Sequence, residues 1–531
     1  MSRCDARTTG RAAAVATLAL AVLVLAGCGA AYDLDEIRAR SDDMAAEILE
    51  AYYNTDAHGE ESDLAGIWES YADLAAPGIP EYVARMRDRE TDPRERKRLD
   101  YLFFDTASTV IYDDLIAIQD EISNAEATGV VVVDGDSIAY RDIGIMFYNE
   151  TDSERRQRYY DAMGAFEAEN LNPLRARMVA ESRSRLREFG FESLDAFEAD
   201  RRNLDHDAFE ETVLDLLGAT RDIYWELTND AAREVFGVDV TEVPDYDRGQ
   251  LFRGAEFDAY FPADGMMSFM RETFLGMGID IDALPIDVDD EDRPEKEPRA
   301  ATYGIRPGRD VRILLKPSGG VDDYATLFHE MGHGIHDGVV TVTEYEFQRL
   351  GDYGVTETYA YIPEQLFMDP LFITDSGLIT DDRVLGRFLK NQLLGSLGSA
   401  RYYAGLFRYE RFLHTGEHSQ DELAQAYGRY MEDSRLVPLA HPEYGYLSSN
   451  EDFYGVNYLE AWILAAQLRH AFRERFGERW WDSKEAGALW VELMEYGAEL
   501  SAVEVAQYVG FDGLDSSYYI DEVRRAYEAY R

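Results

Sequence analysis

The sequence has very little cysteine: only Cys4 and Cys28 occur in its 531 residues. Cys4 lies in an N-terminal segment that we expect to be removed, so the mature chain has one cysteine and can form no internal disulfide. A chain of about 500 residues with 46% hydrophobic content can nevertheless bury a large core. Its stability therefore has to come from the core alone.

Lysine is also scarce, because 47 of the 52 basic residues are arginine. They face 104 acidic residues, and the formal net charge is −52. This charge argues against nucleic acid as a partner. It also destabilises a compact state unless salt screens it, and the Debye length is about 3 Å at 1 M salt. The composition is typical of acidic proteins from halophilic organisms.

The sequence has few long hydrophobic runs, and the one at the N-terminus, from Ala12 to Ala26, is too short to span a bilayer comfortably. Three arginines precede it, as in a signal peptide. The segment ends in Leu-Ala-Gly-Cys28, which resembles a bacterial lipobox. The resemblance implies cleavage after residue 27, lipidation of Cys28, a short tether over 28–33 and an extracytoplasmic lipoprotein held at a membrane. An ordinary secretory signal is the alternative.

The motif that carries chemistry lies in the stretch D-D-Y-A-T-L-F-H-E-M-G-H-G-I-H-D, where His329 to His333 read H-E-x-x-H. Two histidines four residues apart lie one helical turn from each other, so both rings can reach one ion. Imidazole suits zinc, and a catalytic zinc site has three protein ligands. Glu330 is then placed to take a proton from water at the open position.

The residues around this motif predict a helix. Ser318-Gly319-Gly320 is a break, Asp322 and Asp323 put negative charge in the first turn, and Gly338 is expected to stop the helix. Most other positions are apolar, which indicates a buried helix. A chance occurrence of the motif is the alternative, but three of the nine histidines fall between positions 329 and 336.

The third metal ligand has to come from another segment. His336 lies seven residues after His329, about 10 Å along the helix axis, so one zinc ion cannot bind all three rings. Glu357 opens an apolar segment, Thr356 to Phe367, so a helix there could direct it inward. The first two downstream carboxylates lie in a polar connector and are expected to be solvated. The candidates are Glu344, Glu346, Asp352, Glu357, Glu364 and Asp369.

H-E-M-G-H with a glutamate two dozen residues later resembles the gluzincin oligopeptidases. These are the thimet oligopeptidase and oligoendopeptidase F family and the related angiotensin-converting enzyme family. The resemblance implies one zinc ion per chain with Glu357 as third ligand. Those oligopeptidases usually follow this glutamate closely with Pro-Ser-Gln, whereas this chain has Thr-Tyr-Ala-Tyr-Ile-Pro-Glu-Gln. Glu364 lies on the same face, if the helix continues through Pro363, and is a candidate partner for a ligand histidine.

A second stretch resembles another signature of the oligopeptidases. It comprises His441-Pro-Glu-Tyr-Gly-Tyr446 and a tyrosine-rich run that includes Tyr454 and Tyr458. The resemblance implies that His441, Tyr446 and Tyr458 donate hydrogen bonds to the tetrahedral intermediate, with Tyr454 as the rival. Such donors stabilise an oxyanion where water is excluded. With 35 tyrosines in the chain, packing is the alternative role.

Most of the remaining chain has helical periodicity. Val130 to Val133 and Ser137 to Tyr140 flank Asp-Gly and predict a hairpin, and 287–297 is expected to be a solvated acidic loop. Ala301 to Ile305 and Val311 to Leu315 predict two antiparallel strands, and by resemblance such a strand beside the motif helix pairs with substrate. Later helices are expected at 384–412, 420–430, 459–476 and 487–508.

The sequence therefore predicts a mostly α-helical zinc metallopeptidase in one unit from about residue 34 to 531, with its motifs between about 300 and 460. By resemblance it has two helical lobes around a central channel and acts on short peptides as a monomer. One alternative is a dipeptidyl carboxypeptidase, which needs a group for the terminal carboxylate. No lysine lies near the tyrosine-rich run to serve it. The other is a lipoprotein that binds metal or peptide without hydrolysis, which has no need of Glu330.

Overall fold

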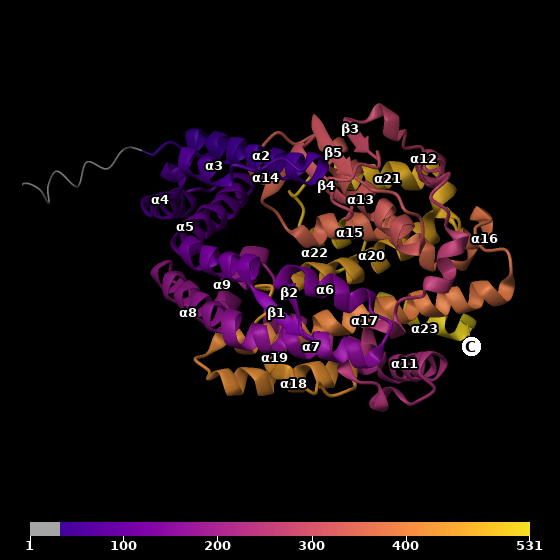
Figure 1. The fold of residues 1–531 in the computed structure, drawn as a ribbon. Coiled ribbons are helices and arrows are strands. Elements are labelled where there is room, and N and C mark those ends of the chain that lie inside the picture. The colour runs from indigo at the N-terminus through magenta and orange to yellow at the C-terminus, as the bar shows by residue number, and fades with distance from the viewer. Residues whose placement is uncertain (1–31, 531) are drawn as a thin grey trace, which may run out of the picture.

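The computed structural model describes residues 32–530, and this part of the chain is mostly helical, as predicted (Figure 1). The predicted signal segment and Cys28 lie outside the described residues. Within 32–530, no helix combines the length and the apolar character needed to cross a membrane.

The first half of the chain is a series of helices interrupted by one hairpin. Strands β1 (Val130–Val133) and β2 (Asp136–Ala139) confirm the predicted hairpin. Its turn residues Asp134 and Gly135 both have positive φ, as a two-residue hairpin turn requires. The helices are α2 (Leu34–His58), α3 (Leu64–Ser70), α4 (Gly78–Arg87), α5 (Pro93–Thr128), α6 (Tyr140–Asn149), α7 (Ser153–Phe166), α8 (Asn172–Glu188), α9 (Leu194–Arg202), α10 (His206–Ala219), α11 (Arg221–Val235) and α12 (Met266–Gly276).

A small sheet separates these helices from the second half. Strands β4 (Ala301–Arg306) and β5 (Asp310–Leu314) are antiparallel, which confirms the predicted pair. A third strand, β3 (Ile286–Asp289), pairs parallel to β5 and gives the order β3-β5-β4. Residues 290–297 are largely exposed, as expected for a solvated loop. The expectation was wrong for 287–289, which belong to β3, and for Lys296, which is buried and forms a 2.9 Å ion pair with Asp289.

The second half of the chain contains the predicted motif helix and the longest buried helices. Its helices are α13 (Val321–Val339), α14 (Tyr345–Arg349), α15 (Tyr353–Glu364), α16 (Pro370–Ser376), α17 (Asp382–Thr415), α18 (Gln420–Arg435), α19 (Pro442–Gly445), α20 (Gly455–Phe476), α21 (Lys484–Met494), α22 (Ala502–Tyr508) and α23 (Ser517–Tyr530). The prediction of a single helix over 487–508 was wrong, because residues 495–501 separate α21 from α22.

Helix α20 is buried on all sides and organises the packing of the second half. Nearly all of its residues from Gly455 to Phe472 are buried, including the polar Asn457, Glu460, Gln467 and Arg469, as expected of a core helix rather than a surface one. It packs against α15 on one side and against α17 and α23 on the other. Residues of α20 consequently belong to both of the two largest hydrophobic clusters, one built with α13 and α15 and the other with α10, α11 and α17.

Helix α13 lies between α15 and the sheet because glycine faces both neighbours. A Cβ atom at Gly332 would lie 2.6 Å from the Ala360 Cα atom of α15, and one at Gly334 would lie 2.6 Å from Ile313 Cδ1 of β5. The expected stop at Gly338 was wrong, since α13 continues to Val339. Gly338 instead lies where a Cβ atom would approach Ile286 of β3 to 3.3 Å.

We expect Gly332→Ala to destabilise the protein by about 1–3 kcal/mol, because the added methyl group has to push apart two packed backbones. Gly395→Ala is the matched control: Gly395 lies in α17 with open space around it, so alanine there should stabilise the helix by about 0.5–1 kcal/mol. Denaturant unfolding in high salt measures both. Equal effects of the two substitutions would contradict the close approach of α13 and α15.

Candidate metal centre

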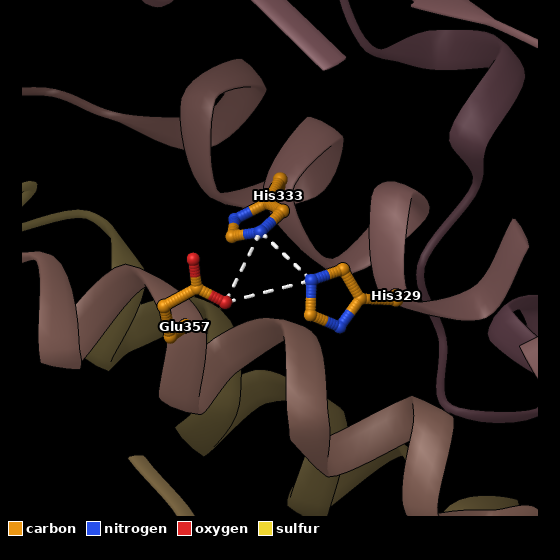
Figure 2. A group of neighbouring side chains, drawn as sticks. All are labelled: His329, His333 and Glu357. Atoms are coloured by element: carbon orange, nitrogen blue, oxygen red, sulfur yellow. Dashed lines mark hydrogen bonds and ion pairs between the residues drawn. The ribbon is translucent and has the colours of Figure 1, made fainter. Parts of the chain in front are cut away.

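Helices α13 and α15 bring His329, His333 and Glu357 together, with one ligand atom of each within 4.8 Å of the others (Figure 2). The two Nε2 atoms are 3.2 Å apart, and Glu357 Oε2 lies 3.5 Å from His329 Nε2 and 3.8 Å from His333 Nε2. Ligands about 2.0–2.1 Å from one tetrahedral zinc ion lie about 3.3 Å from each other. The three atoms therefore have the spacing of a zinc site.

Hydrogen bonds on the far side of each ring fix which nitrogen faces this group. His329 Nδ1 lies 2.7 Å from Glu364 Oε2, and His333 Nδ1 lies 3.1 Å from Thr356 Oγ1. A histidine that donates its Nδ1 proton to such a partner keeps a lone pair on Nε2. Helix α15 does continue through Pro363, which confirms that Glu364 faces the same side as Glu357.

The oxygen of Glu357 that faces the rings is buried and has no hydrogen-bond partner among the described residues. A buried carboxylate oxygen without a donor is costly. A cation held between it and the two Nε2 atoms satisfies all three groups, and two nitrogens with one oxygen form a donor set that suits zinc. The residues present therefore fit the ion that the sequence predicts.

Burial and neighbouring charges both shift the pKa values of the centre. Burial lowers the pKa of His329, but the hydrogen bond and charge of Glu364, with the charge of Glu357, outweigh it and raise the pKa to about 9. Burial raises the pKa of Glu357 to about 7. Burial and the neighbouring His329 hold the pKa of His333 well below its ordinary value. The charges of Glu364 and Glu357 therefore favour a positive charge at His329.

Glu330 follows the first histidine and lies against the sheet. Its backbone carbonyl accepts a 2.8 Å hydrogen bond from Thr302 Oγ1 of β4, so the edge strand runs directly beside the motif. Burial raises the pKa of the Glu330 carboxyl above its ordinary value. A carboxylate with a raised pKa is a better proton acceptor near neutral pH.

Aromatic residues from α15 and from the start of α20 line the same region. The Tyr454 hydroxyl lies 3.5 Å from Glu357 Oε1, and the Tyr458 ring packs edge-on against the Tyr454 ring at 5.5 Å. The Tyr361 ring lies edge-on to His329 at 5.0 Å. Tyr361 and Thr356 were missed from the sequence, although their spacing from Glu357 on α15 could have indicated both.

The loop before Tyr454 has a strained backbone. Asp452 and Phe453 have φ values of 50° and 68°, a region that residues other than glycine rarely adopt. The Phe453 carbonyl accepts a hydrogen bond from Arg202 at 3.0 Å, and the buried Glu410 accepts one from the Glu451 amide at 2.6 Å. These contacts hold the loop in the conformation that presents Tyr454 to Glu357.

The structure does not bring His441 or Tyr446 to this centre. Tyr446 is only 4% exposed and packs in a separate cluster with α17 and α18, where its carbonyl accepts a hydrogen bond from Tyr409. His441 pairs with Glu443 at 3.0 Å and stacks on Tyr444 at 4.8 Å. The role that the resemblance gives these two residues has no support from their positions.

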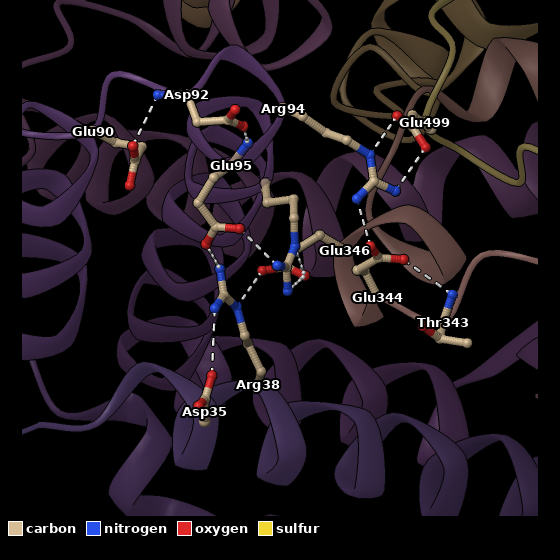
Figure 3. Close-up of polar contacts among 11 residues, drawn as sticks. Asp35, Arg38, Glu90, Asp92, Arg94, Glu95, Thr343, Glu344, Glu346 and Glu499 are labelled. Carbon is tan, nitrogen blue, oxygen red and sulfur yellow. Dashed lines mark hydrogen bonds and ion pairs between the residues drawn. The ribbon is translucent and has the colours of Figure 1, made fainter.

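The other candidate ligands have structural partners of their own. Glu346 is fully buried between Arg38 and Arg98, at 2.5 Å and 3.0 Å, so the expectation that it is solvated was wrong (Figure 3). Glu344 pairs with Arg94 at 2.5 Å. Asp352 and Asp369 accept backbone N–H groups as helix caps. Glu357 is the one of the six that converges on the two histidines.

Comparison of the chain with models of known families and with curated proteins finds no match.

We expect Glu364→Gln to lower zinc affinity by about 10–100-fold, because the amide orients His329 less firmly and no longer adds a negative charge. His329→Ala or Glu357→Ala should abolish stoichiometric binding. Metal content per chain by mass spectrometry, together with competition against a fluorescent chelator, measures the effects.

His441→Gln is the control for this series, because it removes an exposed imidazole that lies outside the group of three. It should leave zinc affinity unchanged. Full zinc affinity in Glu357→Ala would refute the assignment of the third ligand.

Proposed function

We propose that this protein is a zinc-dependent peptidase that hydrolyses peptide bonds in short peptides, as its resemblance to the gluzincin oligopeptidases implies. The observation that carries the proposal is the convergence of two histidine nitrogens and one unpaired carboxylate oxygen at 3.2–3.8 Å, with Glu330 directly beside the first ligand. When bound, zinc supplies a Lewis acid that polarises a carbonyl and lowers the pKa of water.

Glu330 is the general base of the proposed reaction. Its carboxylate takes the proton of the attacking water and then gives it to the leaving amine, so the same group acts as base and acid. A binding protein that only held metal would have no use for this residue. Its raised pKa and its place beside β4 support this role.

Tyr454 is the donor we propose for the oxyanion. Its hydroxyl lies beside Glu357 and is presented by a strained loop, which is where a donor that has to be preorganised is expected. Tyr458 packs against its ring and supports its orientation. These two tyrosines take the role in preference to His441 and Tyr446.

The edge of β4 is suited to a short extended peptide. β4 is the outer strand next to the motif, so a substrate can add to it by backbone hydrogen bonds with little demand on side chains. Arg349 donates to the carbonyls of Gly304 and Ile305 at 3.0 Å and 2.7 Å, which leaves Ala301–Tyr303 as the part that can pair. The short free part of β4 limits the length of peptide that can pair with it. The two lobes and the channel of the families that the chain resembles would restrict the length further.

The proposal includes the cell surface or periplasm as the place of action. The lipobox at Cys28 would anchor each monomer to the membrane through its lipid. The high negative charge favours a stable, active fold in concentrated salt, which screens the repulsion.

We expect residues 29–531, loaded with zinc in high salt, to cleave short peptides internally, whether their C-terminus is free or amidated. Mass spectrometry of the products is the measurement. Release of C-terminal dipeptides only from free acids would indicate a dipeptidyl carboxypeptidase instead.

Glu330→Gln is the matched inactive variant, expected to retain zinc and lose at least about a thousandfold in kcat. If no peptide is cleaved by the unaltered chain, the proposal is wrong and the metal-binding lipoprotein remains.

Tyr454→Phe should lower kcat by about 10²–10³-fold with little change in KM, because the lost hydrogen bond forms only in the transition state. Tyr446→Phe provides the comparison and should retain full activity, since its ring lies in another cluster. Steady-state kinetics on one peptide separates the two. The reverse pattern would return the role to Tyr446.

A further inference from the structure

A cavity of 520 Å³ lies between helices α2, α3 and α5 on one side and β4, α13, α14 and α15 on the other. One face of α2 and one face of α5 form its walls, and Gly304 of β4, Asp337 of α13 and Tyr353 of α15 also line it. The buried Glu346 between Arg38 and Arg98 ties α2 and α5 to α14, so the cavity is built on braced elements (Figure 3).

Three of the lining residues place the cavity along the path of a bound peptide. Asp337 follows His333 by four residues and Tyr353 precedes Glu357 by four, each about 6 Å along its helix. Gly304 follows Thr302, the residue that contacts Glu330, by two positions on β4. The cavity therefore begins about one helical turn from the centre, beyond the part of β4 that is free to pair.

Two carboxylates in the cavity, those of Asp105 and Asp337, form no close ion pair with a described residue. The Asp337 carboxylate accepts no hydrogen bond from any described residue, and Asp105 accepts one, from the Tyr345 hydroxyl at 3.1 Å. Burial raises the pKa of each to about 6. The charge of Arg349 partly offsets the effect of burial on the pKa of Asp337. The Arg349 guanidinium is itself engaged by Asp42 at 2.6 Å and by two backbone carbonyls. At neutral pH both acids are anions whose desolvation a cation would relieve.

Aromatic rings complete the lining. Trp68 and Tyr112 stack at 5.2 Å, and Tyr112 and Tyr353 remain 42% and 44% exposed. Large rings left exposed beside buried anions form the surroundings that guanidinium and ammonium groups prefer, because the ring faces and the carboxylates both attract positive charge.

We propose that this cavity is a subsite that binds a positively charged group of the peptide, on the N-terminal side of the cleaved bond. A peptide that adds antiparallel to β4 has its N-terminal side directed from Thr302 toward Gly304, and so into the cavity. The group is a basic side chain or the free α-amino group, which share this chemistry. The inference rests on the proposed peptidase function and adds a substrate class to it.

The test uses four peptides that differ only in the N-terminal part: lysine or norleucine two or three residues before the cleaved bond, each with a free or an acetylated N-terminus. We expect Asp337→Asn and Asp105→Asn to lower kcat/KM for the preferred cationic peptide by about tenfold or more, and to leave the acetylated norleucine peptide unchanged. Unchanged hydrolysis of the acetylated norleucine peptide shows that each variant is folded. Asp382 is an exposed acid at the start of α17, so Asp382→Asn is the control and should leave kcat/KM unchanged for both peptides.

Calorimetric binding of the same peptides to zinc-loaded Glu330→Gln, with and without Asp337→Asn, separates this subsite from catalysis. A loss confined to lysine peptides assigns the side chain, and a loss confined to free N-termini assigns the α-amino group. Equal kcat/KM and binding for all four peptides would overturn the subsite while leaving the peptidase intact. If nothing is hydrolysed but cationic peptides still bind through Asp337, the subsite holds and the peptidase function fails.

Discussion

The close approach of α13 and α15 at Gly332 is the constraint on which the metal centre depends. Glu357 and the two histidines come from different helices, and their ligand atoms meet only because the Gly332 position has no side chain between the two backbones. The same approach brings Glu364 to His329 and Thr356 to His333. A single missing methyl group therefore sets the spacing of the ligands and of the groups that orient them.

The sequence predicted the parts of this arrangement that are local. Helix periodicity located α13, α15 and the buried α20, and turn residues located the hairpin and the β4–β5 pair. Glu357 needed the family resemblance to be selected among six carboxylates, and Glu364 followed from its position on the same helix. Gly338 was predicted to stop the helix, but it instead allows α13 to pack against strand β3. The local sequence pattern did not indicate this strand.

The residues that sequence reasoning placed incorrectly are those whose environment is made by distant segments. Glu346 reads as a solvated connector residue, yet two arginines from the first helices surround it completely. Tyr446 and Tyr454 lie in one tyrosine-rich stretch, and only the path of the chain decides that one faces a separate core and the other faces Glu357. Cavities such as the one lined by Asp105 and Asp337 likewise have no signature in a single stretch of sequence.

The ion pairs that join the two ends of the chain also have a consequence for folding. Arg38 and Glu346 are 308 residues apart, and Arg94 and Glu499 are 405 apart. Helices α2 and α5 therefore gain these partners only when nearly the whole chain is available. Contacts of such long range slow folding, because chain entropy is lost before they form. The N-terminal helices are synthesised first, yet the Arg94–Glu499 pair can form only after residue 499 has been made.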